Sequence, residues 1–183
     1  MSKFYLSITE EQETLIRNAP LFFVASVDPR SMPGSGLKDA ADTAQAGSAK
    51  KGEDPGPVNV SPKGGSPLHV LGPNRVAYVD FLGSGNETAR HVQAGGPVTL
   101  MVCSFEEQDA AIVRLYGRAV VRSVDDAALP EGIFETKASQ FRFKARQVID
   151  VDVEKTMTSC GYGVPILEPV RERSKAEWGR KYK

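Results

Sequence analysis

The stretch that decides the fold is VTLMVCSFEEQDAAIVRLYGRAVVRSV, residues 98–124. Its two apolar runs, 98–104 and 111–124, contain many Val, Ile and Thr residues, whose branched side chains fit a pleated, half-buried surface. Polar and charged residues around 106–109 separate the runs and are typical of a short turn. The stretch therefore predicts two strong strands joined by a polar turn.

Further apolar runs of strand length lie on both sides of this pair, bounded by Pro, Gly, Asp or Asn. These predicted strands are 21–27, 58–61, 68–71, 75–82 and 147–158. Two short helices are also expected, one after the capping-box residues Thr9 and Gln12 and one after the turn at 83–86. A sheet of this size must close or be covered to hide its edges. The pattern predicts a mainly β (α+β) barrel of about six antiparallel strands with short flanking helices.

The chain has the length of one domain. It contains 183 residues, of which 40% are hydrophobic, so we expect a single domain, 1–183. Between Leu37 and Val58 there is no Leu, Ile, Val or aromatic residue, and such a segment buries too little apolar surface to offset the cost of ordering. We predict a flexible insertion at about 31–57 and a charged, exposed helical tail from about residue 171.

The charge balance argues against polyanionic partners. Lys and Arg together number 23, as do Asp and Glu, so no net field draws the protein to nucleic acid or anionic lipid. No apolar stretch approaches the roughly 20 residues that span a bilayer, and the first residues lack the apolar core of a leader peptide. We expect a soluble, cytoplasmic protein without nucleic-acid or membrane partners.

The sequence does not predict a metal site or a disulfide bond. The two cysteines, Cys103 and Cys160, have no CxxC spacing, and the only histidines are His69 and His91. Neither set has the spacing of a zinc site or of a disulfide framework. We expect no metal centre, a structural His91, and a Cys103 that acts as a small core residue.

The turn Gly83-Ser84-Gly85-Asn86-Glu87-Thr88 is the main candidate for ligand binding. It follows an apolar strand and opens a helix, so its backbone N–H groups and its Ser, Asn and Thr side chains could hold an anion such as phosphate. The spacing differs from the GxGxxG fingerprint, so a dinucleotide is not implied. A plain turn capped by Ser84 or Asn86 remains the alternative.

Several basic residues are weaker candidates. Lys63 lies beside two glycines at the expected end of a strand, where it is either a site cation or a solvated turn residue. Arg114 and Arg118 are spaced evenly on one strand, which places both on one face. That face lines a polar groove or is the solvated side of the sheet. Arg90, on the helix after the turn, is open to the same two interpretations.

Taken in order, four segments resemble the pyridoxamine 5'-phosphate oxidase-related FMN-binding proteins. The segments are FFVAS at 22–26, VNVSPKG at 58–64, YVDFLGSGNET at 78–88 and RLYGR at 114–118. The segment SCGYGVP at 159–165 is similar to a subgroup of the same family. The ordered combination covers most of the chain and is more specific than any one segment.

This resemblance implies a split β-barrel and a homodimer with FMN at the subunit interface. It places the strand end that contains Asn59, Val60, Ser61 and Lys63 beside the isoalloxazine ring, where Lys63 would offset negative charge on the reduced ring. It places Ser84, Gly85 and Asn86 at the FMN phosphate. The family's oxidase has a basic pair at this turn, so here the resemblance leaves the phosphate to backbone N–H groups, Thr88 or an arginine. The candidate arginines are Arg90, Arg114 and Arg118.

The resemblance implies an FMN-dependent oxidoreductase whose substrate and electron donor are unknown. Tyr162 is expected to border the substrate pocket. Three alternatives stay open: a flavin-binding or storage protein without turnover, a split barrel that holds haem or a deazaflavin, and an interaction module without a cofactor. Oxidation of pyridoxamine phosphate itself stays open, because the turn departs from the oxidase's basic pair and the oxidase's C-terminal substrate-binding segment has no clear match.

Overall fold

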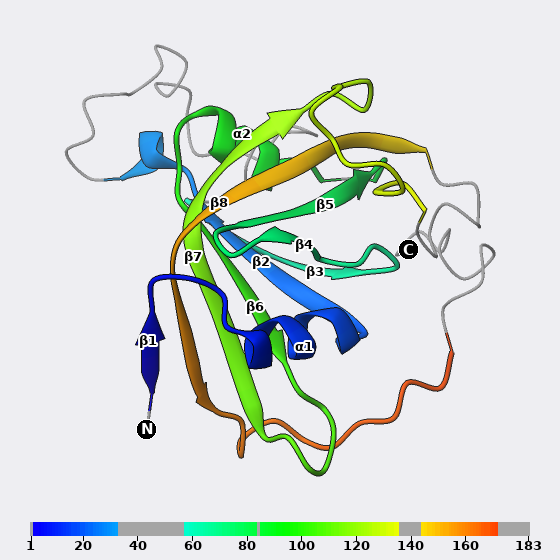
Figure 1. Cartoon of the computed structure of the whole chain (residues 1–183). Helices are drawn as coiled ribbons and strands as arrows, with labels where there is room; N and C mark the ends of the chain where they lie inside the picture. The colour runs from blue at the N-terminus through cyan, green and yellow to red at the C-terminus, as the bar shows by residue number, and fades with distance from the viewer. Residues whose placement is uncertain (1, 33–56, 84, 136–143, 172–183) are drawn as a thin grey trace, which may run out of the picture.

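The structure is a computed structural model that describes residues 2–32, 57–83, 85–135 and 144–171. In these residues, eight strands form one curved sheet, and two α-helices lie against it (Figure 1). In chain order the elements are β1 (Lys3–Tyr5), α1 (Glu10–Asn18), β2 (Leu21–Val27), a 3-10 turn η1 (Pro29–Ser31), β3 (Val58–Gly64), β4 (His69–Gly72), β5 (Arg75–Phe81), α2 (Glu87–Gln93), β6 (Val98–Cys103), β7 (Ala111–Arg122) and β8 (Ala145–Cys160).

The strands form a single antiparallel sheet in the order β3-β2-β6-β7-β8-β5-β4, and β1 pairs with the far half of β8. The sheet curls so that its two ends approach each other, but β3 and β4 do not pair (Figure 1). We call the gap between β3 and the β5–β4 end of the sheet the open seam. The expected split β-barrel is therefore confirmed.

Two details of the sheet differ from the prediction. The described residues form eight strands where about six were expected; seven correspond to the predicted runs, and the eighth, β1, has three residues and is too short to give a pattern of its own. The sequence also predicted that the strand beginning at Val58 ends at Ser61, whereas β3 continues through Pro62 to Gly64. Pro62 is compatible with a strand here because β3 is at an edge of the sheet, where a missing N–H breaks no ladder.

Alternation along the strands builds the main core inside the barrel. Side chains that point inward include Phe22, Val24, Leu100 and Leu115, all of which are buried. The rings of Phe22 on β2 and Tyr78 on β5 meet edge to face with centroids 5.2 Å apart. This contact joins two strands that are not neighbours in the sheet. Packing across the interior therefore holds the curled shape.

The two predicted helices are present. Thr9 and Gln12 form the expected capping box at the start of α1, and α2 follows the turn at 83–86 as predicted. Most of the predicted insertion (33–56) and most of the predicted tail (172–183) lie outside the described residues. Among the described residues, no helix is long and apolar enough to cross a membrane.

The polar and the apolar side chains of β3 lie on opposite faces of the sheet. Asn59, Ser61 and Lys63 pair with Ser26, Val24 and Phe22 and share their inward face. The opposite face of the sheet, which we call the outer face, has two rows of side chains in register across the strands. These rows are Pro62-Phe23-Met101-Arg114-Met157 and Val60-Ala25-Thr99-Tyr116-Lys155.

Candidate functional site

A pocket of ≈ 210 Å³ opens where the polar row of β3 faces the turn before α2. Its walls come from β3, from the end of β5, and from the segment that leads into α2. The lining residues are Ser61, Lys63, Asp80, Phe81, Gly83, Gly85, Asn86, Glu87, Thr88 and Ala89. The structure thus brings together two segments that the sequence named as cofactor-binding and that are about 20 residues apart.

The side chains of β3 make the contacts across the open seam. Asn59 donates from Nδ2 to Oγ1 of Thr88 at 3.1 Å. The Lys63 ammonium lies 3.1 Å from Oδ1 of Asp80, and the two side chains are only 22% and 13% exposed. The predicted alternative of a solvated turn lysine is wrong, since Lys63 is within a strand and is paired with a carboxylate.

The turn from Gly83 to Asn86 is held by an arginine that the sequence analysis did not identify. The guanidinium of Arg146, at the start of β8, donates to the carbonyl oxygens of Gly83 at 2.8 Å and Gly85 at 2.7 Å. It also donates to Oδ1 of Asn86 at 3.0 Å. A guanidinium only donates, so the amide oxygen of Asn86 faces Arg146, and its NH₂ group points away from that cation.

Gln147 connects the turn to the seam. Its Nε2 donates to Oδ1 of Asn86 at 2.8 Å and to Oδ2 of Asp80 at 3.0 Å. Asn86 is the N-cap residue of α2, as the alternative interpretation expected, but its side chain makes no capping hydrogen bond. Its amide oxygen accepts from Arg146 and Gln147 instead. A polar network runs from Lys63 through Asp80, Gln147 and Asn86 to Arg146.

An acidic side chain also reaches the turn. The Glu87 carboxylate lies over Gly85, where an added Cβ would come within 2.4 Å of Oε2. Its other oxygen is 3.7 Å from the Arg90 guanidinium on the next turn of α2. Arg90 is thus close to the turn, and Glu87 lies between the two.

The buried ring of Tyr78 lies beside the Lys63–Asp80 pair. Lys63 Nζ is 5.7 Å from the centroid of its ring. Burial, with a smaller contribution from the negative charge of Asp80, raises the pKa of Tyr78 far above its ordinary value. The phenol therefore remains protonated at physiological pH.

The remaining predicted residues do not join the pocket within one chain. Arg114 and Arg118 share a face, as the spacing predicted, but it is the outer face, where Arg114 donates to Ser159 and Arg118 to the Gly95 carbonyl. The side chain of Val60 points to the same outer face and is 63% exposed. The sheet separates these three side chains from the pocket. Ser84 lies outside the described residues.

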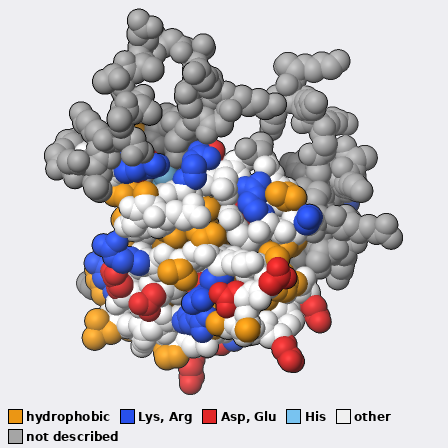
Figure 2. Space-filling model, turned by 90° about the horizontal axis from the view of Figure 1, so that it is seen from above, with side chains coloured by type: hydrophobic (Ala, Val, Ile, Leu, Met, Phe, Trp, Pro, Cys, Tyr) orange, Lys and Arg blue, Asp and Glu red, His pale blue; other side chains and the backbone are white. Residues whose placement is uncertain are grey.

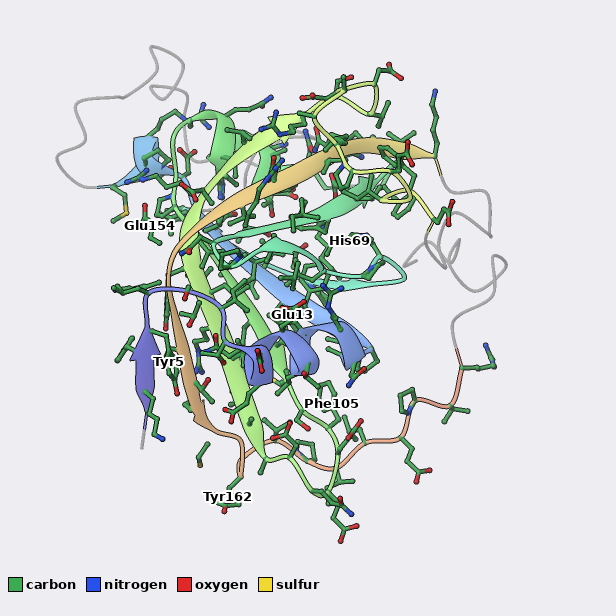
Figure 3. The ribbon with its side chains drawn as sticks, viewed as in Figure 1. Tyr5, Glu13, His69, Phe105, Glu154 and Tyr162 are labelled. Atoms are coloured by element: carbon green, nitrogen blue, oxygen red, sulfur yellow. The ribbon has the colours of Figure 1, made fainter. Side chains whose placement is uncertain are left out.

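Tyr162 is also away from the seam pocket. It follows β8 at the lower end of the barrel, whereas α2 and the end of β5 lie at the upper end (Figures 1 and 3). Within one chain it therefore does not line the seam pocket, and its expected place beside a substrate pocket stays a prediction. His91 and Cys103 are structural, as expected: both are buried, and His91 Nδ1 is 2.9 Å from the Ser26 hydroxyl.

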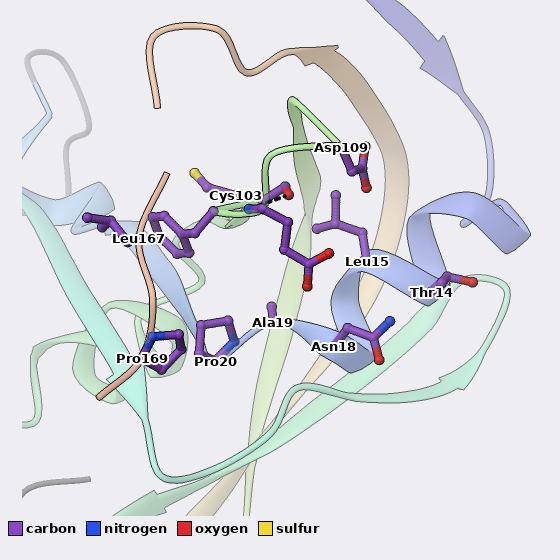
Figure 4. A pocket seen from close by; sticks show the side chains of 12 residues that line it. Thr14, Leu15, Asn18, Ala19, Pro20, Cys103, Asp109, Leu167 and Pro169 are labelled. Carbon is purple, nitrogen blue, oxygen red and sulfur yellow. Dashed lines mark hydrogen bonds between the residues drawn. The ribbon is translucent and has the colours of Figure 1, made fainter. Parts of the chain in front are cut away.

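A larger cavity of ≈ 270 Å³ lies at the lower end, between α1, the β6–β7 turn and the C-terminal segment (Figure 4). Leu15, Ala19 and Leu167 contribute apolar lining, and Glu106 and Asp109 contribute carboxylates. None of the predicted cofactor-binding residues lines it. We assign the candidate site to the smaller pocket at the seam, because it brings Ser61, Lys63 and the turn before α2 together.

Three comparisons with known proteins bear on these observations. No model of a known protein family matches the chain. The pyridoxamine 5'-phosphate oxidase family protein ustO of Aspergillus flavus is 34% identical over 170 residues, which is 92% of this chain and 58% of that protein. The chain thus spans little more than half the length of this curated relative.

Solved structures agree in fold. A Lactobacillus delbrueckii protein named as a candidate pyridoxamine 5'-phosphate oxidase superposes with a TM-score of 0.52 at 23% identity, covering 83% of this chain and 94% of its own. HupZ of Group A Streptococcus gives a TM-score of 0.52 at 20% identity, covering 81% and 91%. At these identities the likeness concerns the fold alone. In sequence this chain is similar to the fungal member of the pyridoxamine 5'-phosphate oxidase family, and in fold it is similar to the split β-barrels of the solved structures.

Proposed function

We propose that the protein binds FMN at the seam pocket and is a flavin-dependent oxidoreductase that works as a homodimer. The observation that carries the proposal is the convergence of the β3 row and the Gly83–Thr88 turn on one pocket. These are the two segments to which the family resemblance assigns the flavin ring and the phosphate. When bound, FMN would supply the hydride chemistry, and the chain would supply binding and orientation.

The β3 edge fits the polar edge of a flavin ring. Among the described strands, β3 has a single neighbour, β2. Backbone N–H and C=O groups on its other side are thus left for a ligand. Ser61 and Lys63 add a hydroxyl and an ammonium group at the pocket wall. A planar ring that carries both donors and acceptors would be held along this edge.

The Gly83–Thr88 turn has donors for a phosphate, but the Glu87 carboxylate must move before a phosphate can bind there. The NH₂ group of Asn86 and the backbone N–H groups around Gly85 are the donors, and Arg146 holds the Gly83 and Gly85 carbonyls on the other side. The Glu87 carboxylate occupies the space over Gly85, so a phosphate at that point has to displace it. Arg90, which is 3.7 Å from Glu87, is then the nearest described cation on α2.

A second subunit would complete the site. The pocket of one chain, ≈ 210 Å³, is smaller than the roughly 300–1,000 Å³ of ordinary ligand sites. The outer face beside it carries exposed Val58 and Val60, together with Phe23 and Met101. A C2 partner would bury this self-complementary surface. Arg114 and Arg118, which are remote from the pocket of their own chain, would then face the partner.

Ligand binding tests this proposal directly. The purified protein, stripped of any ligand, is titrated with FMN and with riboflavin while flavin fluorescence is followed. We expect FMN to bind at least about tenfold more tightly, a difference of roughly 1.4 kcal/mol, because the phosphate adds contacts at the turn. Equal affinities would remove the phosphate assignment, and no binding of either flavin would remove the proposed function.

The spectrum of the protein as isolated separates the alternatives. Absorption and mass analysis of any released ligand would distinguish FMN from haem or a deazaflavin. Anaerobic addition of nicotinamide cofactors then separates an oxidoreductase from a storage protein. A colourless protein that does not take up FMN would support the interaction module instead.

A further inference from the structure

The charge of the seam pocket depends on Asp80, a residue to which the family resemblance assigns no role. We propose that Asp80 sets the electrostatic potential of the pocket by neutralising Lys63, so that the ammonium group does not act on a bound flavin as a full positive charge. This inference rests on the proposed function, because it concerns how the pocket treats bound FMN.

The geometry of the pair supports this role. Lys63 and Asp80 both line the pocket, from β3 and β5, and their charged groups are 3.1 Å apart. At the distance of a ligand across the pocket, the fields of two such opposite charges largely cancel. Both side chains are mostly buried, so water screens them less than it screens surface charges.

Asp80 is also fixed in position. While Oδ1 contacts Lys63, Oδ2 accepts from Nε2 of Gln147 at 3.0 Å. The same Gln147 group donates to Asn86 in the turn. The carboxylate is therefore held by both neighbouring walls and cannot turn away from Lys63 without losing a partly buried hydrogen bond.

The net charge of the pocket depends on Asp80, because few other charged residues line it. The charged residues that line the described pocket are Lys63, Asp80 and Glu87, and Glu87 has Arg90 nearby. With Asp80 ionised, Lys63 contributes no surplus positive charge. Removing the Asp80 charge should therefore turn the wall beside β3 from neutral to cationic.

The test is the midpoint potential of bound FMN in matched variants of the full chain. Asp80→Asn should favour reduced over oxidised FMN by about tenfold, a rise of about 30 mV for a two-electron couple. Lys63→Met should shift the potential by a similar amount in the opposite direction. The double variant should return to within about threefold of the wild type, since it restores neutrality. Asp152→Asn, on β8 and away from the pocket, is the control and should change nothing.

Each outcome decides the matter. An unchanged or lower potential in Asp80→Asn overturns the inference while the protein still binds FMN and keeps its proposed function. The melting temperatures of the ligand-free variants test for a purely structural role. A lower melting temperature with an unchanged FMN midpoint potential would mean that the Lys63–Asp80 pair only stabilises the contact between β3 and β5. Failure of the wild type to bind FMN would instead remove the proposed function, and the inference with it.

Discussion

At the scale of single residues, Glu87 is the group that most opposes an anionic ligand. Its carboxylate lies over Gly85, at the point where the phosphate is proposed to bind. We predict that Glu87→Gln tightens FMN by about threefold to tenfold, because it removes a like charge from a partly exposed site. Riboflavin, which lacks the phosphate, should bind with nearly unchanged affinity.

The comparison of the two ligands is the control for this prediction. An equal gain for FMN and riboflavin would place Glu87 near the ring and not near the phosphate. Glu107→Gln removes an exposed carboxylate from the turn between β6 and β7, which lies at the opposite end of the barrel from α2 (Figure 1). This variant should leave both affinities as they are.

At the scale of strands, Asp150 ties three of them together. It lies on β8, is buried, and accepts hydrogen bonds from Arg75 on β5 and Arg122 on β7. Burial alone would raise the pKa of Asp150, but these hydrogen bonds outweigh burial and lower it. The ionised carboxylate therefore stabilises the folded sheet.

We predict that Asp150→Asn lowers the free energy of unfolding at pH 7 by about 2 kcal/mol, the range of hydrogen bonds to charged groups. Because the folded pKa is the lower one, this stabilisation is complete above the unfolded pKa of about 3.9 and is lost as pH falls through the folded value. Urea unfolding at pH 7 and at pH 3 should show a smaller difference between wild type and variant at pH 3. A constant difference would mean that ionisation of Asp150 is not its source.

At the scale of the whole molecule, the outer face is the feature that one chain leaves unexplained. Val58 and Val60 are 60% and 63% exposed, and they adjoin the row that holds Phe23 and Met101. Contiguous apolar surface of this kind is typical of an interface. We predict that light scattering at low micromolar concentration gives about twice the chain mass of 19.8 kDa.

Val60→Asp should weaken this dimer and weaken FMN binding with it, because a charge would be buried at the interface. FMN should in turn raise the melting temperature and favour the dimer if the ligand contacts both subunits. Val170→Asp, on the exposed C-terminal segment, is the matched control. A monomeric wild type that holds FMN fully would show that one chain builds the whole site.

The sequence by itself determined most of the strands, both helices, the barrel class and the family resemblance, because these follow from local periodicity, from capping residues and from an ordered set of segments. Through the resemblance, it also assigned the β3 residues Asn59, Ser61 and Lys63 and the Gly83–Thr88 turn to one site. A lone acid in the apolar strand RVAYVDFL (75–82) was a signal for Asp80, since a charge within a strand needs a partner.

Only the tertiary structure decided what each charged group faces. Arg146 reaches the turn from about 60 residues away, Lys63 meets Asp80 across the seam, and Arg114 and Arg118 point to the outer face. Local pattern fixes which side chains share a face, but it does not state which face is inward or which strands meet when a sheet curls. That choice comes from packing the whole core, so the partners of the site are a property of the folded chain.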